Sequence, residues 1–273
     1  MQFIHLPAPL SSGSRKSPAW TQPQTTMLDL DQLRALIRDG QERAICREWL
    51  HQREEERLAT LHYEKRHVEW LGGRICAKQA VRQYLMRASQ VRSVSFQAPN
   101  LLILNAASGR PFLDNQALPE DMSGPHLSIS HSRKYAMAMA ASACCGIDIQ
   151  AASEALIRVK DRFCSREEED LLVPALKQQT DSTCLTLLWA AKEAVKKSVS
   201  FERMPGFLDL ALIHIETQPP GCFLFTLAFQ DHHQETRHRP FHPHHQFKVT
   251  VGLYQGYGIA LCLTPSQGGA CNA

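Results

Sequence analysis

The chain has 273 residues, of which 44% are hydrophobic and 21% are charged, and its formal net charge at pH 7 is +3. This length is enough for one large domain, or for two of ordinary size that each bury a core. The mild positive charge does not by itself indicate nucleic acid, and it is compatible with an anionic small molecule.

Neither a membrane anchor nor a secretion signal is expected. The sequence has no run near the ~20 apolar residues of a transmembrane helix. Residues 1–20 lack the continuous apolar core of a signal peptide. Nine cysteines occur without a CxxC pair. We therefore expect a cytoplasmic protein whose cysteines stay reduced, mostly as small core residues.

The first half is predicted to begin with helices and to continue with strands. Residues 1–26 are rich in Pro, Ser, Gln and Thr and are expected to be a flexible leader. Apolar spacing from Leu28 to about Ser89 predicts helices. Strands are predicted at 101–106, 126–132, 134–142 and 144–150, and the last three are expected to be antiparallel neighbours.

The second half repeats the order of helices followed by strands. Two helical blocks, at 152–176 and 181–200, precede predicted strands at 209–217, 222–229, 247–254 and 257–264. This order indicates an α+β fold of two halves, each an antiparallel sheet covered by helices. We place the halves at 27–145 and 146–265, with a tail at 266–273, and find no short sequence repeat.

Residues 231–246 hold six of the 13 histidines. Such a tract could bind metal. Its prolines and its lack of helical spacing favour a polar surface loop between two strands.

Asp148 is unusual because it interrupts an apolar strand, "CCGIDIQ". Strand alternation places Asp148 and Gln150 on one face and the two isoleucines on the other. An unpaired carboxylate there would cost several kcal/mol, so it must be paired or must bind something. Oxygen ligands of this kind suit Mg²⁺, and a hydrogen-bonded structural aspartate is the alternative.

The segment "WAAKEAVKK" places Trp189, Glu193 and Lys197 four residues apart, with Lys192 beside them. This spacing brings side chains together on one helix face. An ordinary amphipathic helix with a Glu–Lys surface pair has the same pattern.

Three further signals are weak alone. His131 follows the serines of "SISHS" and could contact an anion or cap a turn. The turn "SGRP" exposes Arg110. Arg74, Lys78 and Arg82 form a basic stripe that by default is a solvated helix face.

Taken in order, these motifs resemble one family. The segments "GRP", "SISHS", "GIDIQ", "RFCSREE" and "WAAKEAVKK" span residues 109–197, and "GGRICAKQ" at 72–79 extends the likeness. The pattern is similar to that of the 4′-phosphopantetheinyl transferases of the longer, Sfp-type (surfactin-synthetase) branch.

The resemblance implies a fold and an activity. The fold is a pseudo-dimer of two similar α+β halves with coenzyme A in the cleft between them. The activity is transfer of the phosphopantetheine arm of coenzyme A to a serine of an acyl or peptidyl carrier protein, with release of adenosine 3′,5′-bisphosphate. Such carriers serve fatty acid, polyketide or nonribosomal peptide synthesis.

The resemblance also implies residue roles. Asp148 and Glu193 would hold Mg²⁺ against the diphosphate, Glu193 would help to deprotonate the serine through a bound water, and Lys197 would assist the departing phosphate. Where Gln150 stands, many relatives have a glutamate as third metal ligand, so this place keeps a carbonyl oxygen but loses the charge. The coenzyme A contacts would be Arg74, Gly109, Arg110, Pro111, Ser130, His131 and Lys192.

The implied partners are a carrier protein domain and coenzyme A, with no nucleic acid and no membrane, and a monomer is expected because one chain supplies both halves. Two alternatives stay open. A non-catalytic relative that binds coenzyme A or a carrier would fit Gln150. A metal- or nucleic-acid-binding protein would use the basic stripe and the histidine tract.

Overall fold

The structure is a computed structural model that describes residues 1–6, 10, 22–88, 96–119, 122–199, 206–218, 221–230 and 246–264. The described residues form two compact units, unit 1 up to Ala143 and unit 2 from Cys144. The boundary expected after residue 145 falls inside strand β7 (Cys144–Ala151), which begins unit 2.

Unit 1 contains a six-stranded sheet in the order β1-β2-β6-β5-β4-β3. Every neighbouring pair is antiparallel. The strands are β1 (Phe3–Ile4), β2 (Gln24–Asp29), β3 (Ile103–Asn105), β4 (Pro111–Leu113), β5 (His126–Ser132) and β6 (Tyr135–Ala141).

The prediction that residues 1–26 are a flexible leader is wrong where the chain forms β1 and the start of β2. Strand β2 pairs with both β1 and β6, so it lies inside the sheet. Its Thr26 is buried, and the hydroxyl donates to the Cys76 carbonyl at 2.6 Å. A polar composition suggested a loose segment, but threonine is also a good strand former, and here the sheet supplies partners.

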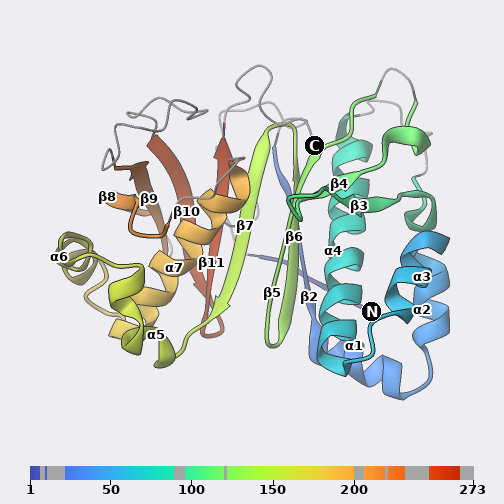
Figure 1. Cartoon of the computed structure of the whole chain (residues 1–273), viewed down its shortest axis with the longest axis horizontal. Helices are drawn as coiled ribbons and strands as arrows, with labels where there is room; N and C mark the ends of the chain where they lie inside the picture. The colour runs from blue at the N-terminus through green and yellow to red at the C-terminus, as the bar shows by residue number, and fades with distance from the viewer. Residues whose placement is uncertain are drawn as a thin grey trace. The chain divides into compact units, whose positions relative to one another are not determined.

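The helices expected between Leu28 and Ser89 are confirmed. They are α1 (Leu30–Arg38), α2 (Glu42–Trp49), α3 (Gln52–Ala59) and α4 (Glu64–Ala88), and short 3₁₀ turns follow at Ala98–Asn100 and Asn115–Ala117. Helix α4 runs along one face of the sheet (Figure 1). A Cβ at Gly72 would overlap the side chain of Leu30, so glycine permits this close approach.

Unit 2 contains a five-stranded antiparallel sheet in the order β7-β11-β10-β9-β8. The four strands predicted near the C-terminus are confirmed as β8 (Leu210–Gln218), β9 (Cys222–Phe229), β10 (Gln246–Tyr254) and β11 (Tyr257–Thr264). The helical blocks form α5 (Ala155–Arg158), a 3₁₀ turn (Lys160–Arg162), α6 (Arg166–Ala175) and α7 (Asp181–Ser198).

Strand β7 is not the neighbour of β6 that the short connection suggested. It pairs with β11, residue for residue from Cys144 opposite Thr264 to Ala151 opposite Tyr257. The short connection between β6 and β7 therefore does not form a hairpin. It joins the last strand of one sheet to the first strand of the other.

The two units share one topology. In each, one strand (β2 in unit 1, β7 in unit 2) is followed by helices and then by four strands, and this strand pairs with the last of the four. Strands β2 and β3–β6 of unit 1 correspond in this order to β7 and β8–β11 of unit 2. Each unit also has its own hydrophobic core. An α+β fold with two antiparallel sheets is therefore confirmed, and the pseudo-dimer with its cleft stays a prediction.

Among the described helices, none is long and apolar enough to cross a membrane. Among the described cysteines, seven are free thiols, and six of those are buried. Cys144 forms a disulfide, which departs from the expectation that the cysteines stay reduced. The histidine tract lies outside the described residues apart from Gln246.

Candidate functional site

Asp148 lies on β7 and faces helix α7. Its side chain is buried, with 6% of the residue exposed. The Lys197 ammonium donates to Asp148 Oδ1 at 2.7 Å and to the Ile147 carbonyl at 3.2 Å. The charge that interrupts this apolar strand is therefore paired with a cation of the neighbouring helix, as the cost of burying it requires.

Gly146 explains why strand and helix come so close. A Cβ at this position would overlap the carbonyl oxygen of Ala194 on α7. Backbone therefore lies against backbone, which only glycine allows. Asp148 is two residues further along the same strand face, so it is directed at the turn of α7 that carries Glu193 and Lys197.

Glu193 lies in the electrostatic field of both neighbours. Burial raises the pKa of this half-buried carboxyl, the Lys197 ammonium lowers it, and the Asp148 carboxylate raises it again. Asp148 of β7 and Lys197 of α7 therefore pair directly, and Glu193 on α7 interacts electrostatically with both.

This donor set fits a divalent cation such as Mg²⁺, which takes one or two carboxylates and completes its shell with water and phosphate oxygens. The described residues contain no group of three or more His, Cys, Asp or Glu side chains arranged for a metal. Gln150, on the same strand face, is half-buried, and its amide nitrogen donates to the Ala151 carbonyl at 3.3 Å. Whether its oxygen is a third ligand stays a prediction.

Lys192 does not lie where the resemblance placed it. It is fully buried, with 0% exposed. Its ammonium donates to Glu168 Oε2 at 2.9 Å and to the carbonyls of Phe163 and Phe207 at 2.7 and 3.1 Å, and it lies 2.7 Å from Glu168 Oε1. An ammonium with all its donors engaged inside the core is not available to a phosphate, so Lys192 is not placed to contact coenzyme A.

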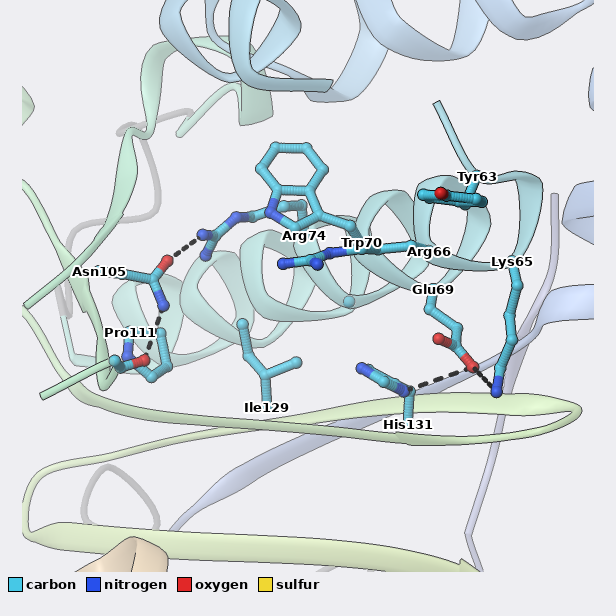
Figure 2. Close-up of a pocket in the computed structure, with 12 residues that line it drawn as sticks. Tyr63, Lys65, Arg66, Glu69, Trp70, Arg74, Asn105, Pro111, Ile129 and His131 are labelled. Carbon is cyan, nitrogen blue, oxygen red and sulfur yellow. Dashed lines mark hydrogen bonds and ion pairs between the residues drawn. The ribbon is translucent and has the colours of Figure 1, made fainter. Parts of the chain in front are cut away.

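Unit 1 has a pocket of about 780 Å³ between α4, β5 and the turn before β4 (Figure 2). Four residues that the resemblance implied for coenzyme A line it: Arg74, Gly109, Pro111 and His131. Lys65 and Arg66 add positive charge, and Glu69 lies 3.7 Å from the His131 imidazole. The pocket is therefore predominantly basic.

Arg74 has unused hydrogen-bonding capacity although it is 5% exposed. One guanidinium nitrogen donates to the Asn105 side chain, whose own amide donates to the Gly109 carbonyl at 2.7 Å (Figure 2). Within the part of the chain that the structure describes, Nε and Nη1 have no partner. Burial lowers the pKa of Arg74. Buried donors without acceptors are costly, so the site favours an anion.

Two other predicted contacts lie apart from this pocket. Strand alternation directs Ile129 and His131 toward it, and both line it, so Ser130 faces the other way and is buried. Arg110 is half-buried and near His126, whose pKa is lowered mainly by burial and further by Arg110. The structure thus does not bring Ser130 or Arg110 to the pocket wall.

The basic stripe is not a solvated helix face. Lys78 has 0% exposed and is paired with Glu54, while Arg74 is buried in the pocket. Arg82 lies over the ring of Trp49, 5.9 Å from its centroid. This stripe therefore does not support the alternative of a nucleic-acid-binding surface.

Several residues of the site were missed at the level of sequence. Asn105 carries no motif, and the closeness of Gly146 to α7 depends on a contact 48 positions away along the chain. Glu168 could have been noticed, since "SREE" from Ser165 has the Ser-x-x-Glu spacing of a capping box. The structure confirms that capping box at the start of α6.

Residues 144–262 match the family model of the 4′-phosphopantetheinyl transferase superfamily. The match begins at the first residue of β7, ends within β11 and includes Asp148, Glu193 and Lys197. Unit 2 carries the sequence features of this superfamily. The match covers less than half of the chain, and a search among curated proteins finds no match.

Two solved structures are similar to part of the chain. One is the holo-ACP-synthase from Plasmodium yoelii, with 18% identity over 43% of this chain and 90% of that chain and a TM-score of 0.34. The other is the holo-[acyl-carrier-protein] synthase from Neisseria meningitidis, with 20% identity over 43% and 94% and a TM-score of 0.35. At these TM-scores the likeness adds no argument of its own.

Proposed function

We propose that this protein is a Mg²⁺-dependent phosphopantetheinyl transferase of the Sfp type that acts on an acyl or peptidyl carrier protein. One observation carries the proposal. In the segment that matches the superfamily, the buried Asp148 of β7 meets Lys197 and the electrostatic field of Glu193 on α7.

The reaction forms one bond and breaks one. The carrier serine oxygen bonds to the phosphorus that bears the pantetheine, and the bond from that phosphorus to the bridging oxygen of the diphosphate breaks. Pantetheine phosphate stays on the serine, and adenosine 3′,5′-bisphosphate leaves. The serine proton must go to a base, and the leaving phosphate needs a cation.

Residues of unit 2 match these needs. Glu193 is suited to help deprotonate the serine through a bound water, because its half-buried carboxyl lies on α7 beside Lys197 and interacts electrostatically with Asp148. Lys197 can donate to the departing phosphate oxygen. Asp148 and Glu193 would hold Mg²⁺, which when bound neutralises diphosphate charge.

Unit 1 supplies an anion pocket. Arg74 offers two buried donors without acceptors among the described residues, and Lys65, Arg66 and His131 surround the same space. These groups would bind phosphate of coenzyme A, and the side chain of Trp70, 5.0 Å from the Arg74 guanidinium, keeps that guanidinium in place.

The test is arm transfer by an Asp148→Asn variant, which keeps the size of the side chain. An apo carrier protein, coenzyme A and Mg²⁺ are incubated with the protein, and mass spectrometry detects a gain of about 340 Da, the mass of the transferred group. We expect the wild type to transfer and the variant to be slower by more than about 100-fold, since even outer partners of metal ligands cost 10- to 100-fold.

Asp170→Asn serves as the matched control, because Asp170 is an exposed acid of the same unit. Its rate should equal that of the wild type. An Asp148→Asn protein with wild-type rate would contradict the assignment of this residue. A wild type that binds coenzyme A but modifies none of several carriers would instead support the non-catalytic alternative.

A further inference from the structure

Each unit contains a fully buried lysine that is paired with a buried glutamate. In unit 2 the Lys192 ammonium binds Glu168. The same carboxylate accepts from the backbone N–H of Ser165 at 2.8 Å and of Leu212, in β8, at 2.7 Å. A single ion pair thereby ties helix α7 to the start of α6 and to the first strand after α7.

Unit 1 has the same arrangement. The Lys78 ammonium of α4 binds Glu54 and donates to the Ala98 carbonyl at 3.0 Å. The Glu54 carboxylate accepts from the backbone N–H of His51 at 3.0 Å and of Ile103, in β3, at 3.3 Å. As in unit 2, the glutamate is the N3 residue of a capping box, here at the start of α3.

This correspondence reveals a repeat that the sequence did not make obvious. "AKQAVR" at 77–82 aligns with "AKEAVK" at 191–196, so the two buried lysines occupy the same place. The next residue is Gln79 in unit 1 and Glu193 in unit 2. Unit 1 therefore keeps the ion pair but lacks the carboxylate, and the only acid of β2, Asp29, caps helix α1.

The pair fixes how α7 is turned about its axis. Lys192 also donates to the carbonyls of Phe163 and Phe207. The ring of Trp189, on the preceding turn, packs against both rings at centroid distances of 5.1 and 4.5 Å. Successive residues are about 100° apart around a helix. With Lys192 held on one side, Glu193 must lie on the neighbouring side, which adjoins β7.

We propose that Glu168 and Lys192 are positioning residues that hold Glu193 toward Asp148. Glu54 and Lys78 are their counterparts in unit 1, where they orient the turn of α4 that bears Arg74. A buried ion pair adds little net stability against apolar substitutes, but it favours one geometry. The kinetic test of this proposal rests on the proposed function. Mg²⁺ binding provides a second measurement that does not depend on transfer.

The experiment compares Lys192→Met with Lys78→Met, since both changes remove one buried ammonium and leave a similarly bonded carboxylate. Mg²⁺ binding is measured by calorimetry, and kcat, KM for coenzyme A and the Mg²⁺ concentration for half-maximal rate are measured per folded molecule. We expect Lys192→Met to weaken Mg²⁺ binding and to lower kcat by about 10- to 100-fold with little change in KM. Lys78→Met should instead raise KM and leave the Mg²⁺ affinity unchanged.

Other outcomes overturn the proposal. If both variants lose similar thermal stability while Mg²⁺ affinity and kcat per folded molecule stay at wild-type values, the pairs only stabilise the fold. If Lys192→Met does not fold, Glu168→Gln replaces it, because that change keeps the shape of the side chain and an oxygen acceptor. The Mg²⁺ affinity and the kcat of this variant then decide between positioning and stabilisation alone. A wild type that binds Mg²⁺ but transfers nothing contradicts the proposed function alone, since the Mg²⁺ affinities of the variants still test positioning. A wild type without Mg²⁺ affinity contradicts both.

Discussion

At the residue level, neighbours in one motif have opposite roles. Glu193 is half-buried in the field of Asp148 and Lys197, whereas Lys192, one position earlier, has every donor engaged inside the core. The motif alone marked both as functional. The sequence could not separate them, because their roles depend on contacts with Glu168 and Asp148, which are far away along the chain.

The raised pKa of Glu193 predicts a conflict between stability and activity. Burial and the Asp148 carboxylate both oppose its negative charge, so the metal-free protein carries a destabilising group at neutral pH. We expect Glu193→Gln to raise the free energy of unfolding by about 0.5–2 kcal/mol, the usual range for single stabilising changes. Thermal unfolding in a chelator measures this effect. Transfer should be lost in the same variant, and a drop in melting temperature would contradict the prediction.

His126 predicts a pH effect of definite sign. Burial, and then Arg110, lower its pKa in the folded protein, so between this lowered pKa and the ordinary value near 6.5 the unfolded chain binds more protons. Stability contributed by the neutral imidazole is therefore present above about pH 6.5 and is lost as the pH falls. We expect His126→Gln to lose less stability than the wild type between pH 7 and pH 5. Denaturant titrations at the two pH values measure it, and parallel losses would refute it.

At the level of elements, the sequence predicted the helices of both units and the last four strands well, because their periodicities are regular over many residues. It failed at β2, where a polar composition hid a strand, and at β7, where a short connection suggested pairing with β6. Strand pairing depends on long-range contacts that local patterns do not record.

The contact between β7 and α7 predicts a large effect at Gly146. An alanine there would place its Cβ on the Ala194 carbonyl, which cannot move without shifting the helix. We expect Gly146→Ala to lower the free energy of unfolding by about 3 kcal/mol or more, at the upper end for overpacking. Gly221→Ala is the control, since its added Cβ has no described neighbour within 4 Å and only the positive φ costs, about 1–2 kcal/mol. Equal losses in chemical denaturation would contradict the role of this contact.

At the level of the whole molecule, the two units divide the predicted tasks. Unit 1 holds the basic pocket around Arg74, and unit 2 holds Asp148, Glu193 and Lys197. The family motifs indicated both sets from the sequence, but the Arg74–Asn105–Gly109 contacts depend on how α4 meets the turn before β4.

This division predicts separable defects. Arg74→Met keeps an unbranched apolar stem but removes the donors, so we expect KM for coenzyme A to rise about 10- to 100-fold, as expected for the loss of a charged hydrogen bond. The Mg²⁺ affinity of the metal-free protein should not change. Steady-state kinetics and calorimetry measure the two quantities, and a variant that loses Mg²⁺ affinity while keeping its KM would reverse the assignment.

The duplicated lysine–glutamate anchor has a consequence for the history of such a chain. The residues proposed to position the helix stand directly beside the residue proposed to react, yet the two contact different neighbours. One copy can therefore exchange a reacting side chain, as Gln79 beside Lys78 illustrates, without loosening its own framework. After a duplication, single substitutions of this kind would remove the reacting side chain from one unit while its fold is kept. That unit would then be free to take on substrate binding.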